Sequence, residues 1–155
     1  MLVYIIDGFN LIHKVPALKS ALTPQRALID YIRRRRLTGS KNNRVIIVFD
    51  GNMVSDIKRK ESGFEVFFSG QGSADEIIKS KVSATKGKSE IIVVTDDRQI
   101  RDFILREGAR ALHVREFLKS KTKKKEDHHT KDISYSLQQE ITEELRKTWL
   151  SEHCE

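Results

Sequence analysis

Met1-Leu-Val-Tyr-Ile-Ile-Asp7-Gly-Phe-Asn10 is the stretch that decides the fold of this 155-residue chain. Its first six residues are apolar or aromatic and carry no charge, and the run ends at an acid. A short apolar run rich in Val and Ile predicts a strand buried on both faces, as at the centre of a parallel sheet. Ligands of open α/β sheets bind outside the carboxyl ends of the strands. Asp7 and the nearby Asn10 are therefore candidate site residues.

The same pattern recurs twice further along the chain. Residues 44–50 and 90–96 are apolar runs that also end in an aspartate, Asp50 in the first and Asp96 in the second. Apolar residues at helical spacing predict amphipathic helices over residues 24–37, from Ser73 onward, and around residues 100–104. Strands that alternate with helices predict an α/β fold with a mainly parallel central sheet flanked by helices.

Weaker patterns complete the expected organisation. Residues 64–68 and 111–114 are predicted as further strands, residues 11–22 as a connector, and residues 52–62 as a surface loop or short helix. Gly39 and Gly108 are expected to end the first and third helices. The chain should then consist of a domain over residues 1–118, a basic linker over residues 119–135 and a C-terminal helix over residues 136–155.

Composition limits the class of protein and its compartment. The formal net charge is +7, as in many nucleic-acid binders, although charge alone is weak support for such a function. The single cysteine, Cys154, excludes an internal disulfide and favours a reducing compartment. No apolar run approaches the ~20 residues of a membrane span, and no basic segment precedes the first run as in a signal peptide. We expect a cytoplasmic protein that contacts no membrane and uses no small-molecule organic cofactor.

Acids gather at one predicted edge of the sheet. Asp7, Asp50 and the pair Asp96–Asp97 follow three apolar strands, and Asp75 lies in the first turn of a helix. The carboxyl ends of parallel strands and the starts of the following helices share an edge, so these carboxylates should converge. Carboxylates at such distances repel one another unless their pKa values rise or cations bind.

The chemistry of this donor set favours a hard divalent cation. Oxygen ligands without Cys or His favour Mg²⁺ or Mn²⁺, and two such ions about 4 Å apart would activate water and stabilise the leaving oxygen of a phosphodiester. Asn10 could orient the water or add a neutral ligand. Any one of these aspartates taken alone is more often a turn or helix-cap residue. The hypothesis of a common site therefore depends on their number.

Four short motifs together resemble the NYN domain of the PIN-like nuclease superfamily. They are Asp7-Gly-Phe-Asn10, Val48-Phe-Asp50, Ser73-Ala-Asp75-Glu76 and Val93-Val-Thr-Asp96-Asp97-Arg98, in this order and spacing. The similarity is closest to the YacP-like bacterial branch and covers about residues 1–118. Asp-Gly-x-Asn alone is a weak motif, whereas the four-part set is specific.

The resemblance implies a metal-dependent endoribonuclease with a three-layer PIN-like fold. It carries the family's first acid and asparagine to Asp7 and Asn10, and the helix-start acid to Asp75. The acid of its Thr-x-Asp pattern falls on Asp97, with Asp96 as an extra or alternative ligand. Asp50 matches the YacP-like branch better than the superfamily at large.

The number of metal ions stays open in this comparison. Relatives in the wider superfamily often have one more acid two positions further on, where this chain has Gln99. One tightly bound ion, joined by a second when RNA binds, is as consistent with the residues as two resident ions. The resemblance also suggests work on mRNA in association with the ribosome.

Basic residues are candidate contacts to the RNA backbone, because Lys and Arg contacts to phosphate dominate non-specific affinity. The candidates are Arg33, Arg34, Arg98, Lys119, Lys121, Lys123, Lys124 and Lys125. The alternatives are a solvated helix end for the arginines near residue 33 and a solvated linker for the lysines. Arg98 could instead pair with an acid, and Phe9 could stack a base or anchor a buried turn.

We therefore expect a hydrolase that cuts RNA with Mg²⁺ or Mn²⁺, with Asp7, Asp75 and Asp97 as core ligands and Asp50 and Asp96 in support. The alternative is a non-catalytic RNA-binding module on the same fold, which would keep the acids only for structure.

Overall fold

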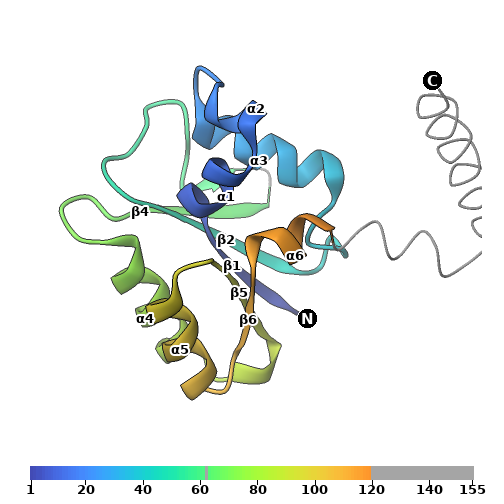
Figure 1. Ribbon diagram of the computed structural model, residues 1–155, viewed down its shortest axis with the longest axis vertical. Helices are drawn as coiled ribbons and strands as arrows, with labels where there is room; N and C mark the ends of the chain where they lie inside the picture. The colour runs from blue at the N-terminus through green and yellow to red at the C-terminus, as the bar shows by residue number, and fades with distance from the viewer. Residues whose placement is uncertain (62, 120–155) are drawn as a thin grey trace, which may run out of the picture. The chain divides into compact units, whose positions relative to one another are not determined.

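The computed structural model describes residues 1–61 and 63–119 of the chain. Met1–Lys119 form one compact unit (Figure 1). The predicted linker beyond Lys119 and the predicted helix over residues 136–155 lie outside the described residues. No helix in the described part is long and apolar enough to cross a membrane.

A six-stranded sheet forms the centre of this unit, in the order β3-β4-β2-β1-β5-β6. The strands are β1 (Val3–Asp7), β2 (Arg44–Phe49), β3 (Lys60–Glu61), β4 (Phe64–Phe68), β5 (Ile91–Val94) and β6 (Arg110–Leu112). Five of them run parallel, and only β3, at one edge, pairs antiparallel with its neighbour. The predicted α/β fold with a mainly parallel sheet is confirmed.

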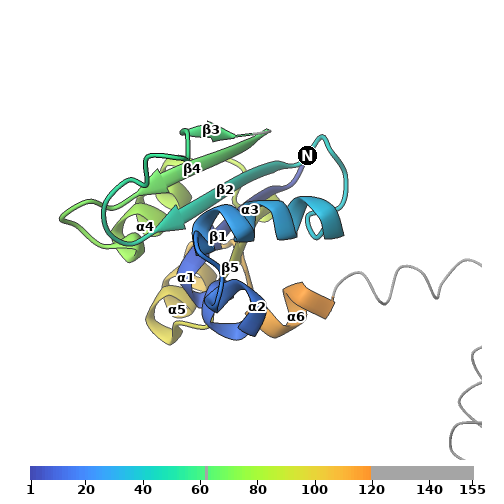
Figure 2. The ribbon, with the colours of Figure 1, turned by 90° about the horizontal axis from the view of Figure 1, so that it is seen from above.

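Helices cover both faces of the sheet (Figure 2). They are α1 (Gly8–Lys14), α2 (Pro16–Lys19), α3 (Pro24–Arg35), α4 (Ala74–Ala84), α5 (Arg98–Arg106) and α6 (Val114–Lys119), and a short 3-10 turn, Lys88–Glu90, precedes β5. One apolar cluster joins α1, α2, α3 and α6 to one face of the sheet, and a second joins α4 and α5 to the other. This arrangement is the three-layer architecture of a PIN-like fold.

The register of the central strands brings the candidate acids to one edge. Asp7 of β1 pairs with Val48 of β2, and Ile6 pairs with Val94 at the end of β5. Asp50 and Asp96 therefore follow the ends of the two strands that flank β1. The predicted convergence of strand ends is confirmed.

Several local signals also behave as expected. Pro24 occupies the first turn of α3, and the hydroxyl of Ser73 accepts a hydrogen bond from the Glu76 amide at the start of α4. Gly108 has a φ of +86° just after α5, which is the backbone conformation that favours glycine at a helix end.

Three local predictions are wrong. Residues 11–22 are not a mere connector: they contain most of α1 and all of α2, whose Leu11, Ile12 and Leu18 are buried in the core. Residues 52–62 include the short edge strand β3. Helix α3 ends at Arg35 rather than near Gly39, because Arg36 already takes the left-handed conformation, with a φ of 48°.

The last predicted strand is shorter than expected. β6 ends at Leu112, and Val114, assigned from sequence to this strand, begins α6. The Glu116 carboxylate accepts a hydrogen bond from the His113 amide at 3.1 Å, which satisfies a backbone donor where the helix begins. The buried side chain of Val114 then packs into the core from a helix instead of a strand.

Candidate active site at the carboxyl edge of the sheet

Asp7 is the central residue of the candidate site. It is the last residue of β1, with 5% of its surface exposed. Its Oδ2 accepts hydrogen bonds from Asn10 Nδ2 at 2.7 Å and from Thr95 Oγ1 at 3.2 Å. Its Oδ1 accepts none from the described residues, which leaves one carboxylate oxygen for a ligand.

Close packing against a neighbouring side chain requires glycine at position 8, next to Asp7. Its φ is not positive, so the backbone conformation does not itself require glycine here. A Cβ at this position would lie 2.2 Å from Cε1 of Phe49, whose ring is fully buried. Phe9 packs edge-on against the same ring, with centroids 5.7 Å apart, as in the buried-anchor alternative. The close approach lets α1 begin directly after the acid.

The electrostatics of Asp7 reflect its burial. Burial, with a smaller contribution from the negative charges of Asp75 and Asp50, raises the pKa of its carboxyl to about 6, against the hydrogen bonds from Thr95 and Asn10. The fold therefore holds this carboxylate at an energetic cost near neutral pH. A cation at the same edge would remove that cost.

Thr95 is a site residue to which sequence reasoning assigned no role. Its fully buried hydroxyl donates to Asp7 and accepts a hydrogen bond from the Asp97 amide at 3.1 Å. It thereby links β1 to the turn that leads into α5. The signal was present in the Thr-x-Asp pattern, but only the structure shows that the hydroxyl reaches β1.

Asp97 lies at the start of α5 and caps it. Its Oδ1 accepts hydrogen bonds from the amides of Gln99 and Ile100, at 2.9 and 3.2 Å. Oδ2 accepts none from the described residues. The side chain is thus fixed by the helix through one oxygen and presents the other, as Asp7 does.

Asp50 follows β2 and holds the start of α4. Its Oδ1 accepts a hydrogen bond of 2.7 Å from the Ala74 amide and one of 3.4 Å from Ser69 Oγ. The side chain is exposed. These bonds bring the first turn of α4, which carries Asp75, to the end of β2.

Asp75 is half-buried in that first turn. Burial raises the pKa of its carboxyl, and the negative charges of Asp97 and Asp50 add to this effect, against the attraction of Lys79. Asp75 also raises the pKa of Asp7. The structure therefore brings Asp7, Asp50, Asp75 and Asp97 into one electrostatically coupled group.

The carboxylate oxygens of this group are suitable ligands for a divalent cation, although they do not converge on a single point. Within residues 1–61 and 63–119, no three Asp, Glu, His or Cys side chains lie close enough to hold one ion. Mg²⁺ is commonly held by one or two carboxylates, with water and substrate phosphate completing its shell. The oxygens of Asp7 and Asp97 that accept no hydrogen bond suit that mode of binding.

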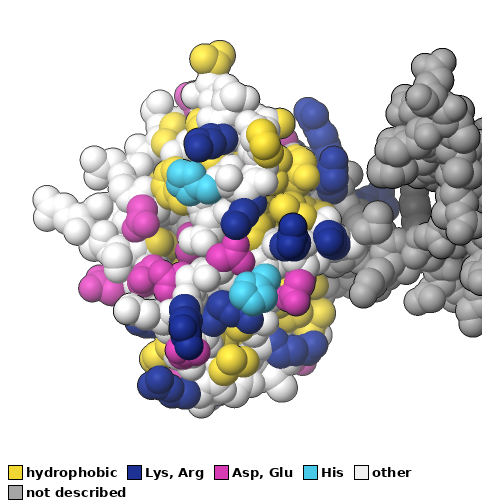
Figure 3. Space-filling model, viewed as in Figure 1, with side chains coloured by type: hydrophobic (Ala, Val, Ile, Leu, Met, Phe, Trp, Pro, Cys, Tyr) yellow, Lys and Arg dark blue, Asp and Glu magenta, His cyan; other side chains and the backbone are white. Residues whose placement is uncertain are grey.

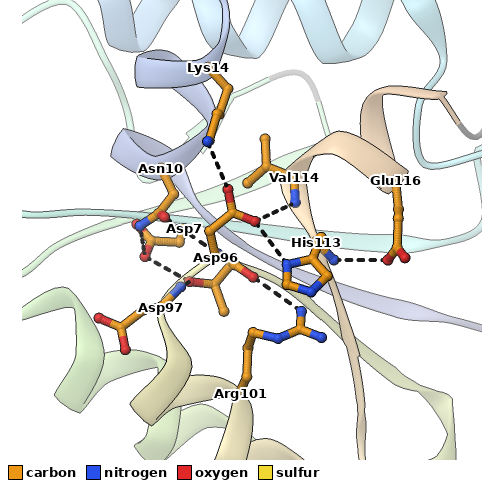
Figure 4. A network of polar contacts seen from close by, with 10 residues as sticks. Asp7, Asn10, Lys14, Asp96, Asp97, Arg101, His113, Val114 and Glu116 are labelled. Carbon is orange, nitrogen blue, oxygen red and sulfur yellow. Dashed lines mark hydrogen bonds and ion pairs between the residues drawn. The ribbon is translucent and has the colours of Figure 1, made fainter.

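The Asp96 side chain is directed away from Asp97 and towards Lys14 and His113 (Figure 4). Its Oδ1 accepts a hydrogen bond from the Val114 amide at 3.1 Å and contacts His113 Nδ1 at 3.2 Å, while Oδ2 lies 3.8 Å from Lys14 Nζ. Partial burial raises the pKa of its carboxyl, but these three partners outweigh burial and lower it. Asp96 thus joins α6 and α1 to the turn after β5, and Asn10 Oδ1 accepts a bond from its amide at 3.4 Å.

Cationic side chains border the acids on the described surface. Arg98 is exposed on the first residue of α5, and Lys14 and His113 lie beside Asp96. Figure 3 shows acidic side chains gathered on the side where α1, α4 and α5 begin, with lysine and arginine side chains around them. Sequence reasoning singled out Arg98 but missed Lys14 and His113, which only the fold brings to this edge.

The other predicted RNA contacts lie elsewhere or outside the described part. Arg33 and Arg34 lie in the last turn of α3, before the loop that leads to the start of β2, at the amino edge of the sheet. Lys119 is the last described residue. Lys121, Lys123, Lys124 and Lys125 lie outside the described residues.

Comparison with solved structures gives related proteins of similar fold. One is Rae1 (YacP) from Bacillus subtilis, with 26% sequence identity and a TM-score of 0.62 over 96% of this chain and 92% of that one. A tryptophan-to-leucine variant of the same protein has 26% identity and a TM-score of 0.59, over 99% and 87% of the two chains. A comparison with curated proteins gave no match.

The family model of the YacP-like NYN domain matches residues 4–155, which is nearly the whole chain. The match agrees with the fold, with the similarity to Rae1 and with the four motifs at the carboxyl edge. This chain belongs to the YacP-like NYN domain family, a family of nuclease-type domains.

Proposed function

We propose that this chain is a metal-dependent endoribonuclease that hydrolyses phosphodiester bonds of RNA with Mg²⁺ or Mn²⁺. The observation that carries the proposal is the coupled group of carboxylates at one sheet edge, with Asp7 buried at its centre and its pKa raised to about 6. Burial of the Asp7 carboxylate beside other negative charges destabilises the fold. A cation bound at this edge would offset that cost.

In this proposal one or two of the carboxylates of Asp7, Asp75 and Asp97 hold the ion directly, and water and substrate phosphate complete its shell. When bound, the ion would activate a water molecule and stabilise negative charge on the leaving oxygen. Asn10 and Thr95 fix the direction of the Asp7 carboxylate through their bonds to its Oδ2. Asp50 and Asp96 act in support, because each holds the start of a helix at this edge.

The substrate part of the proposal rests on charge and family. Arg98 is exposed at the start of α5 beside Asp97, where it would contact a phosphate of the RNA. The net charge of +7 favours a polyanionic substrate. The family resemblance further favours mRNA as the substrate and the ribosome as a partner that presents it.

Cleavage of labelled single-stranded RNA with Mn²⁺ or Mg²⁺ tests the proposal, comparing the native chain with Asp7→Asn and Asp97→Asn. An asparagine oxygen can still accept the bonds from Asn10 and Thr95 or cap α5, so both variants should keep the fold. The control Asp102→Asn removes one negative charge from an exposed position of α5. We expect metal-dependent cutting by the native chain and the control, and its loss in both site variants.

The alternative is a non-catalytic RNA-binding module, and one observation favours it. Asp50 and Asp97 each hold the start of a helix, a structural role that persists without any reaction. RNA that binds but stays whole at every metal concentration, with and without added ribosomes, would support this alternative and contradict the nuclease.

A further inference from the structure

A basic hollow lies at the edge of the sheet opposite the acids. It has a volume of about 820 Å³ and is formed by the end of α3, the loop over residues 36–43 and the start of β4. Arg33, Arg36 and Lys41 line it, and no acid is among its lining residues. Within the described part of the chain, the side chains of Arg36 and Lys41 make no hydrogen bond or ion pair.

Arg36 occupies a backbone position that normally favours glycine. Its amide donates to the Arg33 carbonyl at 3.2 Å, and the Leu37 amide donates to the Ile32 carbonyl at 3.2 Å. These two bonds form a Schellman motif at the end of α3, and Arg36 is its left-handed residue, with a φ of 48°. In the described residues it is the only non-glycine residue with positive φ.

A favourable interaction with the helix dipole does not explain why position 36 carries a cationic side chain. Arg33, Arg34 and Arg35 already place three cations in the last turn of α3, where they favour the helix. Glycine in place of Arg36 would relieve the backbone strain and lose only a side chain that has no hydrogen-bond or ion-pair partner among the described residues. Within the described residues, the guanidinium of Arg36 is therefore available to an anionic ligand.

The loop that carries the cations is fixed in place. Asn43 Nδ2 donates to the Thr38 carbonyl at 2.8 Å, and Asn43 Oδ1 accepts a bond from the Leu2 amide at 3.1 Å. Asn43 thus ties both ends of the loop to the amino end of β1. Cations on a fixed loop lose less conformational entropy on binding than cations on a free one.

The hollow is too far from the acids to hold the phosphate that is cut. Leu2, which bonds the loop, immediately precedes β1, and Asp7 ends that strand. At about 3.3 Å per residue, β1 separates the two sites by about 13 Å or more. A ligand in the hollow therefore contacts the protein away from the carboxyl edge.

We propose that this hollow binds a backbone phosphate of RNA and anchors the substrate at a distance from the cleavage site. Guanidinium and ammonium groups beside the Ser40 hydroxyl and the Asn42 side-chain amide match phosphate oxygens. The choice of RNA over an acidic peptide rests on the proposed function; the cationic hollow does not depend on it.

Binding of a fluorescein-labelled single-stranded RNA in EDTA tests the proposal without any cleavage. The full chain is compared with Arg36→Gly, with Arg36→Lys, and with the control Arg106→Ala, which removes one exposed cation from the end of α5 on the other face of the sheet. Arg36→Gly should weaken binding about 3- to 10-fold and reduce the slope of log affinity against log salt by about 0.7. Arg36→Lys should keep most of the affinity.

The Arg36→Gly variant should bind RNA more weakly but should have a more stable fold. Arg36→Gly should raise Tm by about 2 to 4 °C, because glycine removes the left-handed strain. Weaker RNA binding by a more stable protein cannot come from unfolding, so this combination supports the anchor.

Equal RNA binding by Arg36→Gly and Arg106→Ala would overturn the proposal. Loss of poly-glutamate binding in Arg36→Gly with RNA binding intact would also overturn it, in favour of an acidic protein partner. Binding is measured without metal and is therefore independent of cleavage. A protein that binds RNA through Arg36 but never cuts it would contradict the proposed nuclease function and support the proposed phosphate anchor.

Discussion

Asp7 is the only buried acid within residues 1–60 and 63–119, and its burial makes folding sensitive to pH. Its pKa rises from 3.8 to about 6 in the folded chain. Below about pH 4 the carboxyl is neutral in both folded and unfolded chains. As pH rises towards 6 the unfolded chain ionises first, so the free energy of unfolding falls, and above about pH 6 the loss is complete.

Asp7→Asn should therefore stabilise the protein at high pH in the absence of metal. The neutral amide avoids the cost of ionisation, so at pH 8 in EDTA we expect a gain of about 1 to 3 kcal/mol in the free energy of unfolding, shrinking towards pH 4. Urea unfolding of both proteins at several pH values measures it. A gain that is the same at pH 4 and pH 8 would show that ionisation of Asp7 is not its cause.

Thr95→Val tests the hydroxyl that joins Asp7 to Asp97. Valine keeps the shape of the side chain but leaves the Asp97 amide without its acceptor and removes a donor from Asp7. We expect the free energy of unfolding to fall by about 1 to 3 kcal/mol. The pKa of Asp7 should also rise, because a bond that lowers it is gone, so the pH-dependent loss of stability should extend to higher pH than in the native chain. Thr95→Ser retains the hydroxyl and should retain most of the stability in the same urea series.

At the scale of elements, the acidic edge is an arrangement of helix starts. Asp97 caps α5, Asp50 bonds the first amide of α4, and Asp96 bonds the first amide of α6. Asp50, Asp96 and Asp97 thus each also fix where the next helix, or one further along, begins. The same aspartates hold the starts of helices and form the candidate site. The interpretation of these acids as helix caps and their interpretation as site residues therefore both describe this edge.

Asp96→Ala should loosen α6 and leave α5 unchanged. The Val114 amide would lose its carboxylate acceptor, at a cost of about 1 kcal/mol, while the Asp97 cap on Gln99 stays intact. Amide hydrogen exchange should accelerate at Val114 and not at Gln99. Unchanged exchange at Val114 would mean that the Glu116 bond and core packing suffice to hold this helix.

The sequence predicted the elements whose signals are local. Apolar runs ending in aspartate located β1, β2 and β5, and Ser73 with Glu76 located the start of α4. Residues 11–22 escaped prediction because α1 and α2 are too short for a clear period, and tertiary burial of Leu11 and Leu18 stabilises them. Val114 was misassigned because its helix begins through a bond to Asp96, which is 18 residues away.

For the molecule as a whole, the fold and the edge that carries the acids were predictable, whereas the direction of each carboxylate was not. Parallel strands place their carboxyl ends at one edge of the sheet whatever their order, so all four acid positions reached that edge. The direction of Asp96 depends on Lys14 and His113, which come from distant elements. The cationic hollow depends on a single left-handed residue, for which the arginine run gave no signal.

Within the described residues, a coupled acidic group lies at one edge of the sheet and a cationic hollow at the other. A divalent ion should therefore stabilise the whole fold through one site. At a free Mn²⁺ concentration 100-fold above its dissociation constant, the gain is about 2.7 kcal/mol, or several degrees in Tm. Thermal unfolding at pH 8 should show this increase for the native chain and for Asp102→Asn, and a much smaller one for Asp7→Asn, with NaCl of equal ionic strength as the reference. An equal response of all three proteins would place the ion away from the carboxyl edge and contradict the proposed metal site.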